Sequence, residues 1–513
     1  MHFLDLFDDV LLKIAYECSA IDIFVLERSC RTLRDFFSRP NRPLWLDILR
    51  ELDEFHAPDL PPHITLDSLS SDELKHLAMR AAIGHANWNK PSSSGPRVTR
   101  TRIINLKNKG GMLGDLRQDK HIREVMKIAP GGAGEEFLFI LWSEGYLQCW
   151  DVKKDMAIWT YPQLGTFQNE AVRGYDAEFD TQHGLLFIVV MELSAEPQDW
   201  RSPWCMKTFW LNPETKQATV YRKTNQGFAW DVPSALAICG DVIVMIGNRG
   251  VAIASRVLKQ CFKLTGVEII SDSVAVSDGY LLFVGREGRD EQYSLIALHV
   301  QQLFTHPRIR RASCGFQPDN VGFSLTEELR YLRIKEPLLT VVGHFGSVRL
   351  VPCKMTWRGP PHHTTIFVIG KLNDAAISSS RTHSKSEYTR FWLSLFRFSS
   401  PAGHNSGLPP TLTLQQSTSV SIPLSHPYCT EDVHALSHCG HGILASVNTL
   451  HKGTRYYAFS FEELLEGHGR KPLGPISFGR DHVAPGVVYF EKYSGALIFV
   501  SKDQQKLVIQ YYD

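Results

Sequence analysis

The fold is decided by the stretch EEFLFILWSEGYLQCWDVKKDMAIWTY, which runs from Glu135 to Tyr161. Two runs rich in apolar and aromatic residues flank the turn Ser143-Glu144-Gly145, and a third run follows a polar turn after Asp151. Short apolar runs that are bounded by turn residues are typical of β-strands. The stretch therefore predicts three antiparallel strands joined by tight turns, as one unit of an all-β domain.

The same kind of apolar run returns along the rest of the chain. After the first run at Phe137, others begin about 40 to 85 residues apart, at Leu185, Val242, Tyr280, Ile366, Ile443 and Ala496. This spacing is looser than the roughly 40 to 50 residues of a β-propeller blade, and polar insertions at 373–389 and 401–419 account for part of the excess. We predict a β-propeller of seven blades, with six or eight as the alternatives.

The last unit of the chain is one strand short. Residues 483–513 offer three strands, VAPGVVYF, ALIFVS and LVIQYY, whereas a propeller blade has four. The segment RVTRTRIINL, Arg97 to Leu106, lies at the other end of the β-rich part and has the composition of a strand. Our hypothesis is that it supplies the missing strand and closes the ring, which removes an exposed sheet edge.

Before Trp88 the hydrophobic pattern is helical. Leu6, Val10, Ile14 and Cys18 recur at a spacing of four, which places them on one helix face. We predict a second helix with Asp22 as its N-cap, and the Ser70–Glu73 spacing predicts a capping box for a later helix. The chain is thus expected to be multidomain, with a helical module at 1–57, a linker and docking helix at 58–90, and the β-propeller at 91–513.

Composition argues against several functional classes. The 513 residues are 43% hydrophobic and 21% charged, with a formal net charge of +1, so no global field attracts nucleic acid or anionic lipid. The start MHFLDLFDDV lacks the basic region of a signal peptide, and the apolar runs are too short to span a membrane. Ten cysteines without a CxxC pair are typical of reduced thiols. We expect a protein of the cytoplasm or nucleus without a nucleic-acid or membrane partner.

The N-terminal segment LFDDVLLKIAYECSAIDIFVLERSCRTLRDFFSRPNRPLWLDIL, Leu6 to Leu49, resembles the F-box. The family pattern has an acidic pair, a hydrophobic helix, an Asp-Leu turn, a Cys-Arg step and a closing Leu-Trp. The matching residues are, in order, Asp8, Asp9, Val10, Leu11, Ile14, Asp22, Ile23, Leu26, Cys30, Arg31, Leu33, Leu44 and Trp45. Phe7 stands where the family usually has proline. The following stretch, 69–88, is similar to F-box proteins of fungi, and Trp150-Asp151 resembles the dipeptide of WD-repeat propellers.

This resemblance implies docking onto a Skp-type adaptor, which connects to a cullin scaffold and a RING subunit. The implied adaptor-binding residues are Leu6, Phe7, Asp8, Val10, Leu11, Ile14, Ile23, Leu26, Cys30, Leu33, Leu44 and Trp45. A helical module this short cannot bury all its apolar side chains internally, so a partner surface is expected to complete it. The expected function is a non-catalytic substrate receptor of a ubiquitin ligase. The alternative is a propeller scaffold whose helical module anchors a partner without ubiquitin transfer.

Catalytic motifs are missing from the sequence, which contains no HExxH, no P-loop and no GxSxG. The densest group of possible metal ligands comprises Cys429, His434, His438, Cys439 and His441, but these residues lack the paired spacing of a zinc site and run into an apolar strand. We therefore expect no catalytic residue, no metal and no cofactor.

The target-binding residues are expected on one face of the propeller. In such a fold the loops after the second strand of each blade lie together around the central channel, and loops on a rigid scaffold often bind ligands. The candidate substrate-binding residues in these loops are Glu144, Asn248, Arg249, Arg286, Glu287, Lys371, Asn373, Lys502 and Asp503. Their charges are of mixed sign, so they do not define an acidic or phosphorylated target.

Overall fold

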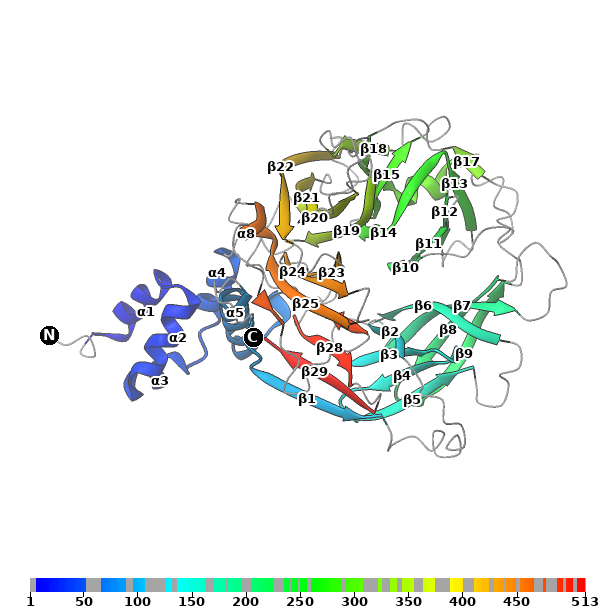
Figure 1. Cartoon of the computed structure of the whole chain (residues 1–513). Helices are drawn as coiled ribbons and strands as arrows, with labels where there is room; N and C mark the ends of the chain where they lie inside the picture. Colours follow the sequence, from blue (N-terminus) through cyan, green and yellow to red (C-terminus); the bar gives the residue numbers. More distant parts are fainter. Residues whose placement is uncertain are drawn as a thin grey trace.

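The computed structural model shows a mostly β chain with helices at its N-terminal end (Figure 1). It describes residues 6–51, 66–88, 96–106, 125–131, 136–162, 170–180, 183–194, 204–224, 235–239, 241–247, 250–255, 260–277, 279–287, 292–307, 322–324, 333–338, 344–354, 363–373, 388–399, 410–423, 429–437, 440–448, 453–465, 474–476, 487–491, 495–501 and 505–512. Within these residues, none of the helices combines the length and the hydropathy needed to cross a membrane.

The N-terminal helices pack around one apolar core. They are α1 (Asp8–Tyr16), α2 (Ala20–Ser29), α3 (Arg31–Phe37), α4 (Arg42–Glu51), the 3₁₀ turn η2 (Leu66–Ser68) and α5 (Ser71–Trp88). Trp45 and Leu49 of α4 lie at the centre of this core with Leu74 of α5, and all three are almost fully buried. In the structure, the name helical module refers to residues 6–88, which include α5 as well as the helices of the predicted module at 1–57.

Local hydrogen bonds explain where two of these helices begin. The capping box predicted for α5 is confirmed, since the Ser70 backbone N–H donates to the Glu73 carboxylate at 2.8 Å and the Glu73 N–H donates to the Ser70 hydroxyl at 3.3 Å. The prediction that Asp22 caps α2 is wrong. Ser19 is the N-cap and Asp22 is the third helical residue, where its carboxylate accepts the Ser19 backbone N–H at 3.1 Å.

The described strands form seven sheets, which Figure 1 shows arranged around a common centre in chain order. Each sheet has four strands except one with five. The first four sheets along the chain consist of β2 (Val125–Pro130), β3 (Phe137–Trp142), β4 (Leu147–Asp151), β5 (Met156–Tyr161); β6 (Glu170–Asp180), β7 (Leu185–Ser194), β8 (Trp204–Asn212), β9 (Gln217–Thr224); β10 (Ala235–Cys239), β11 (Val242–Gly247), β12 (Gly250–Ser255), β13 (Gln260–Thr265), β17 (Gly322–Ser324); and β14 (Val267–Ser277), β15 (Tyr280–Glu287), β16 (Ser294–His299), β18 (Arg333–Pro337).

The other three sheets consist of β19 (His344–Lys354), β20 (His363–Asn373), β21 (Tyr388–Ser399), β22 (Thr411–Pro423); β23 (Cys429–Leu436), β24 (His441–Asn448), β25 (Gly453–Ser460), β26 (Gly474–Pro475); and β27 (Val488–Phe490), β28 (Leu497–Val500), β29 (Lys506–Tyr511), β1 (Arg100–Asn105). Two short helices, α6 (Val300–Thr305) and α8 (Phe461–Leu465), follow third strands of sheets. Each apolar run identified in the sequence coincides with the second strand of a sheet, from Phe137 in β3 to Ala496 beside β28.

Apolar clusters join the sheets side by side. Each cluster combines residues from two neighbouring sheets; for example, one cluster contains Phe139 of β3 and Tyr175 of β6. Such a cluster links every pair of consecutive sheets. The last sheet in the series shares one cluster with the sheet of β23–β26 and another with the sheet of β2–β5. The core of the β-rich part therefore lies between sheets, in contrast to the single core of the helical module.

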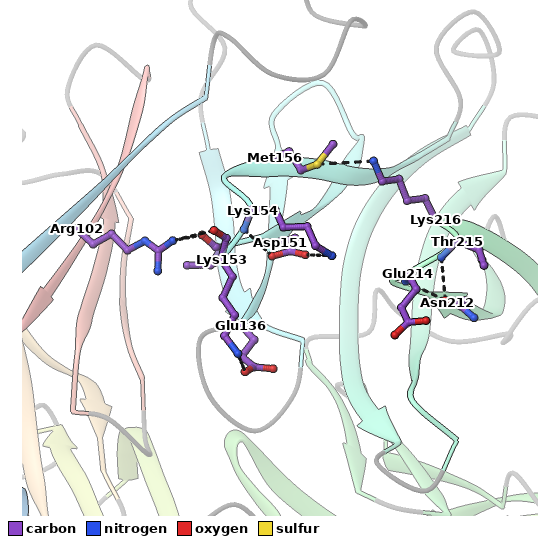
Figure 2. Close-up of polar contacts among 11 residues, drawn as sticks. Arg102, Glu136, Asp151, Lys153, Lys154, Met156, Asn212, Glu214, Thr215 and Lys216 are labelled. Carbon is purple, nitrogen blue, oxygen red and sulfur yellow. Dashed lines mark hydrogen bonds and ion pairs between the residues drawn. The ribbon is translucent and has the colours of Figure 1, made fainter. Parts of the chain in front are cut away.

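The strand β1 joins the two ends of the β-rich part, as the sequence predicts. It pairs antiparallel with β29, from Arg100 opposite Tyr511 to Asn105 opposite Lys506. Figure 2 shows Arg102 of β1 donating to the backbone of the β4–β5 turn, where the carbonyl oxygens of Val152 and Lys153 accept. The N-terminal strand thus holds the C-terminal sheet and contacts the next sheet as well.

The helical module meets the β-rich part through α5, which contacts β25. In Figure 1 the helices α1, α2 and α3 lie on the side of the module away from the strands. The described strands therefore lie on the other side of the module from these three helices.

Candidate partner-binding surface

Four large apolar side chains of the α1–α2 region are exposed. Phe7 is 79% exposed, Val25 60%, Ile21 39% and Tyr16 37%. These four lie within the first 25 residues, and only four other large apolar residues are exposed in the whole described part of the chain. We call Phe7, Tyr16, Ile21 and Val25 the outward apolar residues.

Helix geometry explains why Ile21 and Val25 face solvent. Ile23 is fully buried in the module core, and residues two positions apart on a helix point in nearly opposite directions. Ile21 and Val25 are each two positions from Ile23, and they are four positions apart from one another. They therefore form an apolar stripe on the outer side of α2. Burying such a stripe against a partner is favourable by about 25 cal/mol for each Å² of apolar area.

Phe7 occupies the position where the F-box pattern has proline. It is the N-cap of α1 with an extended backbone, φ −64° and ψ 151°, and its side chain makes no capping hydrogen bond. Because the ring is 79% exposed, it adds apolar area at the start of the helix. Asp8 beside it pairs with Arg39 at 2.5 Å on an exposed surface, where an ion pair contributes little to stability.

The structure divides the twelve predicted adaptor-binding residues by burial. Five are buried in the module core: Leu11, Ile23, Leu33, Leu44 and Trp45. Five are half-buried at the edge of the core: Leu6, Val10, Ile14, Leu26 and Cys30. Only Phe7 and Asp8 are exposed.

Tyr16, Ile21 and Val25 are not among the residues predicted from the sequence to bind the adaptor. The family pattern highlights positions that also build the core, while the exposed apolar residues between them carry no motif. The signal that could have found Ile21 and Val25 is their i, i+4 spacing, out of phase with Ile23 and Leu26.

The candidate substrate-binding residues that the structure describes lie in the β3–β4 turn and at the ends of β15 and β20. Glu144 is exposed in the β3–β4 turn, and Lys371 is half-buried near the end of β20. Asn373 ends β20. Asn248, Arg249, Lys502 and Asp503 lie outside the described residues.

Arg286 and Glu287 already have internal charge partners. Arg286 pairs with Glu268, and Glu287, which is 4% exposed, pairs with Arg333 and with Lys335 at 3.2 Å. A buried carboxylate between two cations stabilises the strand pairing in which it lies, and breaking such a group to bind a ligand is costly. Glu287 therefore has a structural role within its sheet, and its contact with a target stays a prediction.

A second feature of this end of the sheets was not visible in the sequence. The first strands β2, β6, β14 and β19 each contain a bulge or register shift close to their starts, for example between Val125 and Lys127 and between Val172 and Gly174. The bulged residues Met126 and Arg173 are exposed, Met126 by 60%. Bulges redirect side chains and are common beside functional sites, so they mark this end of the β-rich part.

The described residues include part of the Cys and His cluster that was considered as a metal site. No group of three His, Cys, Asp or Glu side chains among them is placed to hold a metal ion. His434 and His441 lie in β23 and β24, whereas His438 and Cys439 lie outside the described residues. Burial raises the pKa of the Cys149 thiol well above its ordinary value, which keeps that thiol protonated and unreactive.

Comparison with known proteins gives no family assignment. No family model and no curated protein matches the chain. Among solved structures, the β-propeller domain of Cps50 (Swd1) from Myceliophteria thermophila is 10% identical, covering 81% of this chain and 99% of its own, with a TM-score of 0.41. The WD40 domain of SCAP from fission yeast is 9% identical, covering 80% and 98%, with a TM-score of 0.40. Because both TM-scores lie below 0.5, we base the fold on the strand pairing within the chain.

Proposed function

We propose that the chain is a non-catalytic substrate-receptor subunit of a cullin-RING ubiquitin ligase. Its helical module binds a Skp-type adaptor, and its β-rich part binds the target protein. The observation that carries the proposal is the outward apolar residues, which lie on helices directed away from the strands in a segment that resembles the F-box. Such a subunit works in the cytoplasm or nucleus by holding its target near a charged conjugating enzyme, which raises the effective concentration.

The β-rich part is, in this proposal, a seven-bladed propeller closed by β1. The pairing of β1 with β29 and the seven inter-sheet clusters support a closed ring. A closed ring has no long exposed sheet edges at its join and presents the second-to-third strand turns on one rigid face. We infer that the target binds on that face.

The adaptor proposal predicts the effect of one exposed residue. Val25→Glu places a charge on the outward apolar stripe without disturbing the core, because Val25 is 60% exposed. We expect this variant to weaken binding of a purified Skp-type adaptor to the full chain at least about tenfold, measured by titration calorimetry. The matched control is Val220→Glu on β9, because Val220 is 61% exposed and lies far along the chain in the β-rich part.

Equal effects of the two variants, or no binding by the unmodified chain, would contradict the proposal. A chain that binds other proteins through its β-rich part but never an adaptor would be an interaction scaffold. Deleting the helical module separates these functions in cells, because targets accumulate after the deletion only if the module leads to ubiquitin transfer.

A further inference from the structure

A pocket lined by both charged and apolar residues opens between α2, α3 and α5, next to Ile21 and Val25 on α2. It has a volume of about 550 Å³, within the range of ligand-binding clefts. Phe24 and Arg28 line it from α2, Arg34 from α3, and His76 and Met79 from α5. Phe24 and Arg28 are four positions apart on α2, and His76 and Met79 are three positions apart on α5, so each pair lies on one face of its helix.

A half-buried ion pair and a hydrogen bond connect the three helices around the pocket. Lys75 of α5 pairs with Glu27 of α2 at 2.8 Å, with side chains only 19% and 17% exposed. The same ammonium donates to the carbonyl oxygen of Phe37 at the end of α3, at 3.2 Å. These contacts neutralise Lys75 and hold the pocket in shape before any ligand arrives, which lowers the entropic cost of binding.

Two guanidinium groups in the pocket remain available. Arg28 stacks on the Phe24 ring, 3.8 Å from its centroid, and this stacking leaves the N–H groups at its edge free to donate. Arg34 is exposed and forms no ion pair with any described residue.

The pocket lining carries a net positive charge. Asp72 is the one lining carboxylate that Lys75 does not neutralise, so Arg28 and Arg34 outweigh it even with His76 neutral. Arginine pairs strongly with carboxylates because two parallel hydrogen bonds form.

The pocket and the apolar stripe belong to one surface. Ile21, Val25 and Arg28 follow one another at i, i+4 and i+7 on α2, so they lie on one side of that helix. A partner that covers Ile21 and Val25 must therefore bring its next residues to Arg28. The chemistry that fits both parts is an apolar segment followed by acidic side chains.

We infer that this pocket receives acidic side chains of the Skp-type adaptor, with Arg28 and Arg34 as the residues that bind them. The inference rests on the proposed function, since the adaptor is the partner that would cover α2. Apolar contact by the stripe supplies affinity, and the two guanidinium groups orient the adaptor and accelerate its association.

The test uses charge reversal in the full chain. Arg34→Glu and Arg28→Glu are each expected to weaken adaptor binding about tenfold and to reduce its dependence on salt concentration. The matched control is Arg31→Glu on α3, the helix that carries Arg34. The Arg31 side chain is 93% exposed but does not line the pocket. That control is expected to change affinity by less than about twofold. Circular dichroism verifies that each variant keeps its helices.

The possible outcomes separate this inference from the proposed function. If Val25→Glu abolishes binding while Arg34→Glu and Arg28→Glu behave like Arg31→Glu, the pocket assignment is overturned and the adaptor proposal stands. If the unmodified chain binds no adaptor, both are overturned. Loss of salt dependence in Arg34→Glu, with Val25→Glu still salt-dependent, supports the pocket specifically.

Discussion

Gly145 shows how strongly a single turn can constrain the β-rich part. Its backbone φ is +85°, and a Cβ placed on it would lie 2.6 Å from the Cβ of Ala171 in the next sheet. Its carbonyl oxygen also accepts the Val172 N–H at 2.8 Å, so the turn cannot move away from that sheet without losing a hydrogen bond. Both the backbone conformation and the close contact therefore require glycine here.

We expect Gly145→Ala to destabilise the β-rich part by about 3 kcal/mol, combining a left-handed backbone with a steric clash. Gly184→Ala is the control, because Gly184 has φ +65° but no described atom within 4 Å of its added Cβ. That variant is expected to cost only about 1 kcal/mol. Urea unfolding followed by near-ultraviolet circular dichroism measures both, and equal costs would show that the contact with Ala171 is easily relaxed.

Tyr456 gives the β-rich part a dependence on alkaline pH. Burial raises the pKa of Tyr456 to about 12, and its side chain is only 4% exposed. An unfolded chain releases the phenol proton near pH 10, so between pH 10 and 12 the folded state binds more protons than the unfolded state. The free energy of unfolding must therefore fall as pH rises through this window, by up to about 2 kcal/mol from this residue.

Tyr456→Phe should remove the share of the decrease in unfolding free energy that this residue causes. Urea unfolding of both proteins at pH 9 and at pH 11.5 measures the difference. The remaining slope reports other buried phenols, such as Tyr512, whose pKa burial also raises. An unchanged slope would mean that Tyr456 ionises without resistance in the folded chain.

At the scale of elements, β1 carries the closure of the β-rich part. Ile104 is 1% exposed and packs in the cluster that joins the first and last sheets, while its neighbour Ile103 is 55% exposed on the opposite face of the same strand. The two residues differ in burial but share the strand and the residue type, so they form a matched pair.

Ile104→Asp should destabilise the β-rich part by about 4 kcal/mol, because a carboxylate would be buried without a partner. Ile103→Asp should cost less than about 1 kcal/mol. Limited proteolysis locates the opening, with the first cuts expected near both chain ends of the β-rich part. Equal resistance of the two variants would show that β1 is dispensable.

For the whole molecule, the narrow contact between α5 and β25 predicts two parts that fold separately. Each part has its own apolar clusters, and Trp45 and its neighbours form a cluster without any strand residue. Deleting residues 1–90 should therefore shift the thermal midpoint of the β-rich part by no more than about 3 °C. A much larger drop, measured by calorimetry against the full chain, would show that the helices complete the core of the strands.

The sequence by itself determined the features that depend on nearby residues. The Ser143-Glu144-Gly145 turn, the Ser70–Glu73 capping box and the seven apolar runs are local patterns, and each could be located before the structure was known. The pairing of β1 with β29 was also predictable, although the partners are about 400 residues apart, because a three-stranded last sheet leaves one open edge.

Only the tertiary structure decided which side chains are left for partners. It buried Trp45 and Leu11, paired Glu287 with Arg333 and Lys335, and left Val25 and Arg34 facing solvent. The physical reason is that burial and charge pairing depend on residues brought together from distant parts of the chain. A motif records residue type and spacing, but the same leucine or glutamate serves a core or a surface according to what packs against it.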